Sequence, residues 1–415
     1  MGAGSGEVFA AARIPTTFLA RTRAKAQRGL ARAESMAKAQ SISTYISIGS
    51  YDADLEREVA DADLIFEAVS ENLDLKRGYF ERIDAARKPD SIVATVSSGL
   101  SIAAMTAGRS ESFARNFLGI HFFNPPNVIT GCELIPHDGT DPEVTAFVDE
   151  LLAHKLGREV VKTSDTPAFC GNRVGFKVLN EVALLAEQYG VAYMDALIGP
   201  HTGRAMAPLV TIDFVGWDVH KAIVDNLHAN TADEAHDDFA LPGYMARLID
   251  AGHLGNKTAD KGGFFKTVDK DLFVLDPARG DYRPAGEVAC EPPDLALHMK
   301  REIRFGRYAR AMDIFAQATG ADADLMRRVI LGYIAYGLRR VGEVVEHPRD
   351  VDRIMGFGFN WAPPSVLVDT IGARRTVQLL QAAGIEAPRV IIEAAERNRK
   401  LFAEPNVDTG RFFFA

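Results

Sequence analysis

The chain has 415 residues, of which 47% are hydrophobic and 25% are charged, and its formal net charge is −9. This length predicts about two to four domains, and the composition is typical of a globular protein that buries a large core. The acidic balance argues against general nucleic-acid binding and against a role at a membrane surface, although an anionic coenzyme needs only a local basic patch.

The three cysteines, Cys132, Cys170 and Cys290, have neither metal-ligand nor disulfide spacing. We therefore expect no metal site and a reducing cytoplasm as the location. Apolar runs stay shorter than the roughly 18 residues that a membrane span needs. The N-terminus also lacks the basic-then-apolar order of a signal peptide, so we expect no membrane insertion.

Short apolar runs alternate with helix-like segments as far as Pro167. The runs that predict strands lie at 16–19, 64–69, 91–96, 116–123, 133–136 and 159–162, and helical periodicity lies at 22–38, 73–86 and 142–155. This alternation predicts an α/β fold with a doubly wound, mainly parallel sheet over residues 1–166. Ligands bind beyond the carboxyl ends of such strands. The polar residues near predicted strand ends are Asp63, Glu71, Ser97, Ser98, His121 and Asn124.

After Pro167 the pattern becomes helical. The predicted helices lie at 172–189, 219–228, 244–251, 299–319, 323–341 and 374–383. A set of four residues also repeats: Asp195, Pro208, Asp213 and Gly216 recur as Asp352, Pro364, Asp369 and Gly372. The repeat predicts two related all-α modules, 167–267 and 295–415. The segment between them, 268–294, is rich in Asp, Gly and Pro and reads as a linker.

His121 and Glu133 stand at the end of one apolar run and the start of the next. A carboxylate that orients an imidazole and favours its charged form lets the ring take a proton from a hydroxyl group. On spacing alone, the commoner explanation is a half-buried structural histidine beside a strand-end carboxylate.

The neighbouring residues favour the first interpretation. The segment 119–126 reads Gly-Ile-His-Phe-Phe-Asn-Pro-Pro and is followed by Glu-Leu-Ile at 133–135. It closely resembles the active-site segment of the L-3-hydroxyacyl-CoA dehydrogenases of fatty-acid β-oxidation. The resemblance extends over nearly the whole chain and is closest to the dehydrogenase half of bifunctional 3-hydroxyacyl-CoA dehydrogenase/enoyl-CoA hydratase proteins. It implies a Rossmann-like NAD-binding domain followed by two related helical modules.

The resemblance assigns four catalytic residues. His121 would remove the 3-hydroxyl proton as hydride leaves C3, and Glu133 would hold the ring and stabilise the imidazolium. Ser98, within 94–102, would contact nicotinamide and substrate, and Asn172, within 169–173, would donate a hydrogen bond to the thioester or the reacting oxygen. A serine N-cap and an asparagine at a helix start remain the structural alternatives for the last two.

The resemblance also implies cofactor contacts. Glu71 and Lys76 match nicotinamide-side contacts, and their spacing of five does not favour an ion pair between them. Ser98 and Asn124 would contact the cofactor too, although Asn124 could equally form a turn before a proline. Lys266 closes the motif 262–266 and would reach back to the cofactor, with a solvated surface lysine as the alternative.

The weakest part of the match is the phosphate-binding loop. Gly2 and Gly4 match the first two glycines of Gly-x-Gly-x-x-Gly, but the strand that should precede them is absent and Glu7 replaces the third glycine. The negative charge of Glu7 at a helix N-terminus would repel pyrophosphate. Too few residues remain before Ala20 for a full-length helix. The chain is then a truncated reading of a normal enzyme, a divergent enzyme that binds its cofactor, or a remnant that has lost binding.

The next predicted strand ends in arginines, Arg21 and Arg23, where an acidic residue should bind the adenosine ribose. These arginines would suit either the 2′-phosphate of NADP or the phosphates of coenzyme A, and we expect NAD.

The sequence thus predicts NAD-dependent oxidation of an L-3-hydroxyacyl-CoA to the 3-ketoacyl-CoA by a His/Glu general-base mechanism. The alternatives are a cofactor-impaired acyl-CoA-binding or assembly protein and a dehydrogenase of a small hydroxy acid. The expected partner is an acyl-CoA substrate and not a nucleic acid. A homodimer and a separate enoyl-CoA hydratase are left open, as is the acyl chain length.

Overall fold

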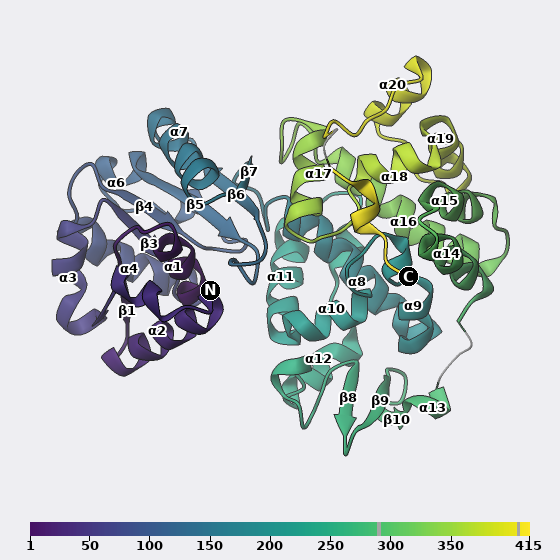
Figure 1. The fold of residues 1–415 in the computed structure, drawn as a ribbon, viewed down its shortest axis with the longest axis horizontal. Coiled ribbons are helices and arrows are strands. Elements are labelled where there is room, and N and C mark those ends of the chain that lie inside the picture. The colour runs from purple at the N-terminus through teal and green to yellow at the C-terminus, as the bar shows by residue number, and fades with distance from the viewer. Residues whose placement is uncertain (289–291, 405–406) are drawn as a thin grey trace. The chain divides into compact units, whose positions relative to one another are not determined.

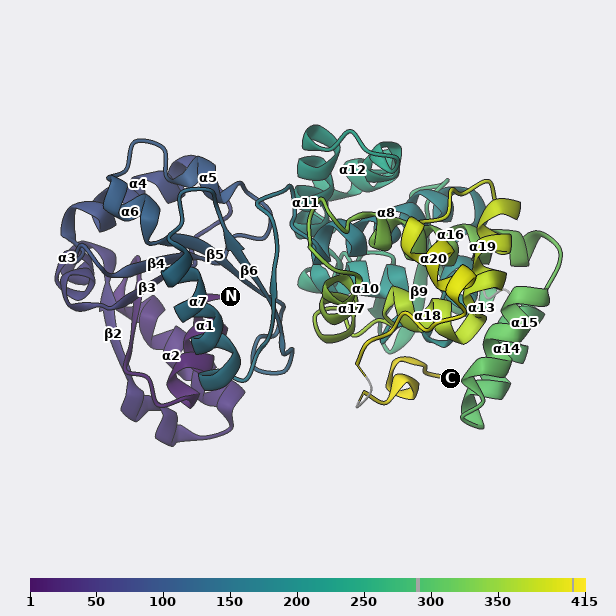
Figure 2. The same ribbon diagram turned by 90° about the horizontal axis from the view of Figure 1, so that it is seen from above.

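The computed structural model describes residues 1–288, 292–404 and 407–415, which form two compact units, Met1–Phe169 and Cys170–Ala415 (Figures 1 and 2). Cys290 lies outside the described residues, whereas Cys132 and Cys170 are free and buried. Within the described part of the chain, no cluster of His, Cys, Asp and Glu is suited to hold a metal ion. Helices of a length and hydropathy that would cross a membrane are also absent from that part.

The first unit contains seven strands and seven α-helices. The strands are β1 (Thr16–Ala20), β2 (Ile46–Ser50), β3 (Leu64–Glu67), β4 (Ile92–Thr95), β5 (Phe117–Phe122), β6 (Gly131–Pro136) and β7 (Glu159–Lys162). The helices are α1 (Gly2–Ala11), α2 (Arg23–Ala37), α3 (Tyr51–Asp61), α4 (Leu73–Ala86), α5 (Ile102–Met105), α6 (Glu111–Arg115) and α7 (Pro142–Glu150), which continues into a π-helical turn at Leu151–Lys155. β1 and β2 form one parallel pair, and the other strands form a sheet of order β3-β4-β5-β6-β7 in which only β5 and β6 pair antiparallel.

Helices cover both faces of the five-stranded sheet. Alternate side chains of a strand point to opposite faces, and here both sets are apolar. Leu118 and Ile120 of β5 pack with Phe9 of α1 and with α7. Phe117 of β5 packs on the other face with α3, α4 and α6, among them Phe80. The predicted α/β fold with a mainly parallel sheet is therefore confirmed.

The start of the chain differs from its prediction. Residues Gly2–Ala11 form a complete helix of ten residues, although we expected too few residues for one. The helix fits into this short segment because it packs closely on β1. A Cβ atom on Gly6 would lie only 2.1 Å from Phe18 Cε1. A turn through Arg13, at φ 62°, then leads directly into β1. β2 and α3 were not predicted, because the short run Ile46–Ser50 carries a weak apolar signal.

The second unit is mainly helical. Its α-helices are α8 (Gly171–Tyr189), α9 (Val191–Leu197), α10 (Pro208–Val215), α11 (Trp217–Asn230), α12 (Gly243–Asp250), α13 (Ala285–Val288), α14 (Asp294–Arg304), α15 (Tyr308–Gln317), α16 (Ala321–Arg339), α17 (Pro348–Phe357), α18 (Pro364–Ile371), α19 (Ala373–Ala382) and α20 (Arg389–Arg397). The helix predicted at 299–319 is two helices, because the chain turns at Gly306 with φ 68°.

The predicted linker contains regular structure. β8 (Phe265–Val268), β9 (Asp271–Asp276) and β10 (Asp281–Pro284) form an antiparallel sheet of order β10-β9-β8. The tight turn between β8 and β9 is made by Asp269 and Lys270, both with positive φ. Asp and Gly residues thus mark hairpin turns here, where we read them as signs of an unstructured connection.

The repeated aspartates hold equivalent positions. Asp195 accepts hydrogen bonds from the backbone N–H groups of Leu209 and Val210 at 2.9 and 3.1 Å, at the start of α10. Asp352 accepts one from the N–H of Ser365 at 3.0 Å, at the start of α18. Each carboxyl group therefore satisfies orphan N–H groups of a helix N-terminus.

The second pair of aspartates is just as similar. Asp213 accepts hydrogen bonds from the N–H groups of residues 264 and 265, both at 2.9 Å. Asp369 accepts from those of residues 401 and 402, at 2.8 and 3.0 Å. In both halves a carboxyl group near the end of a helix thus fixes a distant loop. The two halves therefore share this bonding pattern, and their division into two modules stays a prediction.

Burial gives Asp352 a pH-dependent role in stability. Desolvation raises the pKa of this fully buried carboxyl to about 7, above its unfolded value of about 3.9. A raised folded pKa gives stability that is present below about pH 4 and is lost as pH rises through about 7. We expect the free energy of unfolding to fall less between pH 5 and pH 8 in Asp352→Asn than in the wild type. Urea denaturation at both pH values measures this, and equal pH dependences would contradict it.

Candidate active site

His121 and Glu133 face each other across the antiparallel pair of β5 and β6. His121 Nδ1 lies 2.6 Å from Glu133 Oε2, and the two residues are 4% and 0% exposed. A carboxylate only accepts hydrogen bonds, so Nδ1 donates and the tautomer with a basic Nε2 is favoured. The structure therefore brings together the two residues that the sequence predicted as a pair, in the geometry that a general base requires.

Two phenylalanine rings flank this imidazole. The ring of Phe123 lies 4.8 Å from that of His121, between centroids, and the ring of Phe169 lies at 5.8 Å. Phe169 and its neighbour Ala168 both have positive φ, a conformation that costs free energy in residues other than glycine and is often found at functional sites. Neither ring was predicted as part of the site. Phe123 could have been found by its spacing, because it follows His121 by two residues at the end of the apolar run 116–123.

Ser98 follows β4, where Glu71 fixes the turn. The N–H of Ser98 donates a hydrogen bond to Glu71 Oε1 at 2.8 Å, and the hydroxyl of Ser97 donates to the same oxygen at 2.5 Å. Glu71 is exposed and Ser98 half-buried. The predicted residues Glu71 and Ser98 thus form one polar cluster beyond the ends of β3 and β4.

Lys76 lies beneath this cluster. Its Nζ is 2.9 Å from Glu67 Oε2 and 3.4 Å from Glu71 Oε2, and the residue is 0% exposed. The expectation that Glu71 and Lys76 do not pair was wrong. Asn72 caps α4, because its side chain accepts a hydrogen bond from the N–H of Leu75 at 2.8 Å. Lys76 therefore supports Glu71 from below and has no exposed surface, although we expected it to contact the cofactor.

Glu67 and Thr95, neither of which was predicted as a site residue, complete the buried cluster. The hydroxyl of Thr95 donates to Glu67 Oε2 at 2.6 Å. An acidic residue inside the apolar run of β3 was the signal, because a fully buried carboxylate almost always has a charged partner.

The remaining predicted residues of this unit also lie beyond the carboxyl ends of strands. Asn124 is exposed and follows β5, and its peptide bond to Pro125 is cis. A Cβ atom on Gly2 would lie 3.4 Å from Ala68, directly after β3, and one on Gly4 would lie 2.8 Å from a carbon of Pro126. Asp63 is different: it directly precedes β3, at the opposite edge, and so is removed from the candidate site.

The start of α1 at this edge suits the phosphates of a dinucleotide. The first amides of α1 are near the ends of β3 and β5, and a helix N-terminus favours an anionic group. Glu7, which we expected to repel phosphate, lies in the middle of α1 and is 5% exposed. Burial raises the pKa of its carboxyl, against an opposing effect of Arg158. The objection based on its charge at a helix start therefore does not hold.

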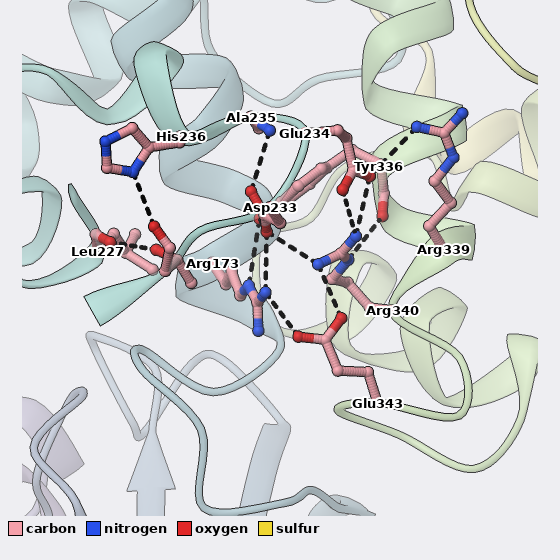
Figure 3. A network of polar contacts seen from close by, with 11 residues as sticks. Arg173, Leu227, Asp233, Glu234, Ala235, His236, Tyr336, Arg339, Arg340 and Glu343 are labelled. Carbon is pink, nitrogen blue, oxygen red and sulfur yellow. Dashed lines mark hydrogen bonds and ion pairs between the residues drawn. The ribbon is translucent and has the colours of Figure 1, made fainter. Parts of the chain in front are cut away.

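Asn172 and Lys266 belong to the second unit. Asn172 is buried in the first turn of α8. Its neighbour Arg173 forms ion pairs with Asp233 at 2.8 Å and with Glu343 at 2.7 Å (Figure 3). Lys266, on β8, places its Nζ 4.0 Å from the centre of the Tyr282 ring. Lys266, which we expected to reach the cofactor, therefore makes a cation–π contact with Tyr282.

Comparisons with known proteins agree with this site. Residues 1–166 match the family model "3-hydroxyacyl-CoA dehydrogenase, NAD binding domain", and residues 169–266 match "3-hydroxyacyl-CoA dehydrogenase, C-terminal domain". A "Probable 3-hydroxyacyl-CoA dehydrogenase" of Bacillus subtilis is 30% identical over 86% of this chain and 45% of its own length. One of Deinococcus radiodurans with the same description is 34% identical over 60% of this chain and 68% of its own length.

Solved structures show the same fold. The structure of 3-hydroxybutyryl-CoA dehydrogenase from Escherichia coli has a TM-score of 0.68 at 21% identity and covers 96% of each chain. The chain spans about half the length of the Bacillus relative, at 45%. NAD is the cofactor of the matched N-terminal domain. Together, the matched regions and the identity to relatives show that the chain belongs to the 3-hydroxyacyl-CoA dehydrogenase family.

Proposed function

We propose that the chain catalyses the reversible, NAD-dependent oxidation of a 3-hydroxyacyl-CoA to the 3-ketoacyl-CoA, as a step of fatty-acid β-oxidation. The observation that carries the proposal is the buried pair of His121 and Glu133 at 2.6 Å. A buried imidazole that a carboxylate orients beside a polar edge has the geometry that a general base requires. The descriptions of the Bacillus and Deinococcus relatives support the same reaction.

In this mechanism Nε2 of His121 accepts the proton of the substrate's 3-hydroxyl group. Glu133 holds Nδ1 and stabilises the imidazolium as the proton arrives, so the charge that forms is compensated inside the protein. When bound, NAD supplies the acceptor for the hydride from C3. Phe123 and Phe169 limit the access of water to the imidazole. In the reverse direction, His121 returns the proton to the forming alkoxide.

Three further residues would orient the reactants. The hydroxyl of Ser98 would contact substrate and nicotinamide, and Glu71 would position it through the backbone N–H of residue 98. Asn124, exposed beyond β5, would contact the cofactor. For Asn172 we propose a hydrogen bond to the thioester or to the reacting oxygen, on the strength of its motif alone.

Glu71→Gln tests the cofactor contacts. The change removes the charge that Ser97, Ser98 and Lys76 all contact. Since hydrogen bonds to charged groups contribute about 1.5–3 kcal/mol, we expect the KM for NADH to rise about tenfold with a smaller change in kcat. Steady-state kinetics at saturating acyl-CoA measure both values. Glu81→Gln, at an exposed position of α4, should leave KM unchanged, and equal effects of the two variants would contradict the role of Glu71.

The activity itself is tested by the loss of NADH absorbance when purified protein meets acetoacetyl-CoA. We expect turnover with NADH, slower turnover with NADPH in a parallel assay, and competition by free coenzyme A. Competition separates this reading from a dehydrogenase of a small hydroxy acid. No turnover with either nucleotide would overturn the proposal.

A second candidate follows from the interrupted sheet of the first unit, in which β1 and β2 pair apart from the other five strands. A dinucleotide site built on such a sheet could lose its cofactor while the chain keeps acyl-CoA binding. Calorimetry separates the two candidates, because the second requires acetoacetyl-CoA binding without NADH binding.

We also propose a cytoplasmic location and a separate enoyl-CoA hydratase as a partner enzyme. Relatives described as "Putative fatty acid oxidation complex trifunctional enzyme", such as that of Rickettsia felis at 26% identity, support a link between these activities. Hydration of an enoyl-CoA yields the hydroxyl group that His121 would deprotonate. A homodimer remains a proposal that size-exclusion chromatography tests.

A further inference from the structure

A cavity separates the two sheets of the first unit. It has a volume of about 670 Å³ and is lined by all residues of β1 and of β3. Among the described residues, β1 pairs only with β2, and β3 pairs only with β4. Each of the two strands therefore presents one edge of backbone N–H and C=O groups to the cavity, and such groups need partners when they are away from water.

The burial of the strands shows that the cavity interrupts the core. Every residue of β4 and of β5 is buried, whereas all of β1 and most of β3 are only half-buried. Phe18 and Phe66 are among the side chains that line the space. Strands in the middle of a parallel sheet are normally covered on both faces. The two strands beside the cavity are thus less buried than their neighbours, although helices already cover both faces of the sheet.

The helix α1 fixes the direction of the two strands. It leads through residues 12–15 into β1 and packs back along it, with Gly6 against Phe18, so α1 begins near the carboxyl end of β1. Gly2, its first residue, also packs on Ala68, directly after β3. The carboxyl ends of β1 and β3 therefore lie at the same end of the cavity, where Met1 also lies, and the two strands run parallel.

We propose that this cavity seats one extended apolar strand that runs parallel to β1 and β3 and is joined directly to Met1. β1 has five residues, which corresponds to a strand of roughly 16 Å. A parallel strand of that length bonds to both open edges and joins the two sheets into one. Its side chains would be covered on both faces, so its composition is a continuous run of Val, Ile or Leu. A strand that ends at Met1 needs no loop to enter α1.

Two fusions to Met1 and one matched control test the proposal. The first carries Lys-Val-Ile-Val-Ile-Val fused to Met1, and its matched control carries prolines at the two isoleucine positions, because proline cannot donate to a strand ladder. We expect peptides covering residues 16–20 and 64–68 to exchange amide hydrogen at least about tenfold more slowly in the first protein than in its control. We also expect a Tm about 5 °C higher or more. A second fusion, with leucine in place of isoleucine, repeats the test in case the first fusion folds poorly.

Equal exchange at 16–20 and 64–68 in the fusions and the control would overturn the proposal. Protection of the unextended chain by the free hexapeptide, without protection in the fusions, would overturn the direct link to Met1. Protection of the unextended chain that grows with protein concentration, together with dimers in size-exclusion chromatography, would assign the cavity to a second copy instead. Each readout is independent of turnover, so the result does not depend on the proposed activity.

Discussion

Replacing His121 with alanine is expected to lower kcat for acetoacetyl-CoA reduction by roughly 10²- to 10⁴-fold, the usual contribution of a positioned general acid–base. The variant loses the imidazole whose Nδ1 lies 2.6 Å from Oε2 of Glu133, the only histidine–carboxylate pair at this distance among the described residues. The KM for NADH should change little, because the imidazole acts on the substrate proton. Stopped-flow or steady-state absorbance of NADH measures the loss.

Two further variants make this result specific. His154→Ala removes an exposed histidine from the π-helical turn of the same unit, and its kcat should equal that of the wild type. Glu133→Gln keeps the size of the side chain but removes the charge that stabilises the imidazolium, so we expect a clear but smaller loss than in His121→Ala. A wild-type kcat in His121→Ala would contradict the assignment of His121 as the general base.

Replacing Lys76 with methionine is expected to destabilise the first unit by about 3–5 kcal/mol, since it leaves a buried carboxylate without its partner. Glu67 is 6% exposed and Lys76 0%, with 2.9 Å between their charged atoms. The loss should appear as a lower denaturant midpoint when the unfolding of residues 1–169 is followed. Glu67→Gln introduced together with Lys76→Met should recover part of the loss, because it removes the uncompensated charge.

Lys88→Met is the matched control for this experiment. Lys88 forms an ion pair with Asp63 at 2.6 Å, but the two side chains are 37% and 96% exposed. Exposed pairs contribute at most about 1 kcal/mol, so this variant should unfold close to the wild type. If both lysine variants lost the same stability, the destabilisation would come from the lost lysine side chain and not from burial of the pair.

The sequence predicted the elements of the first sheet well because its buried strands are short, apolar and separated by helical periodicity. β4, β5 and β7 lie within or match the predicted runs, and α4 matches 73–86. The pair of His121 and Glu133 was predicted from the resemblance of its surrounding segment to a known active-site segment, and the antiparallel pairing of β5 and β6 brings the two residues face to face. Local pattern and tertiary pairing agree at this place.

The features that escaped prediction depend on contacts between distant segments. Lys76 is buried because β3, β4 and the start of α4 meet around it. Its spacing of five residues from Glu71 does not indicate this tertiary contact. The hairpins after Phe264 and the break at Gly306 depend on positive φ, which Asp, Lys and Gly allow but do not require. The close approach of Gly6 in α1 to Phe18 in β1 is likewise a tertiary contact.

The ion network of Figure 3 has a consequence for how the second unit is held together. Asp233, in the first helical half, pairs with Arg173 of α8 and with Arg340, which follows α16 in the second half. α8 and α16 have 19 residues each and pack against each other. The two helical halves share one chain, so they meet at a fixed effective concentration. The apparent melting temperature of this interface should therefore not change on dilution, unlike that of the same two halves on separate chains.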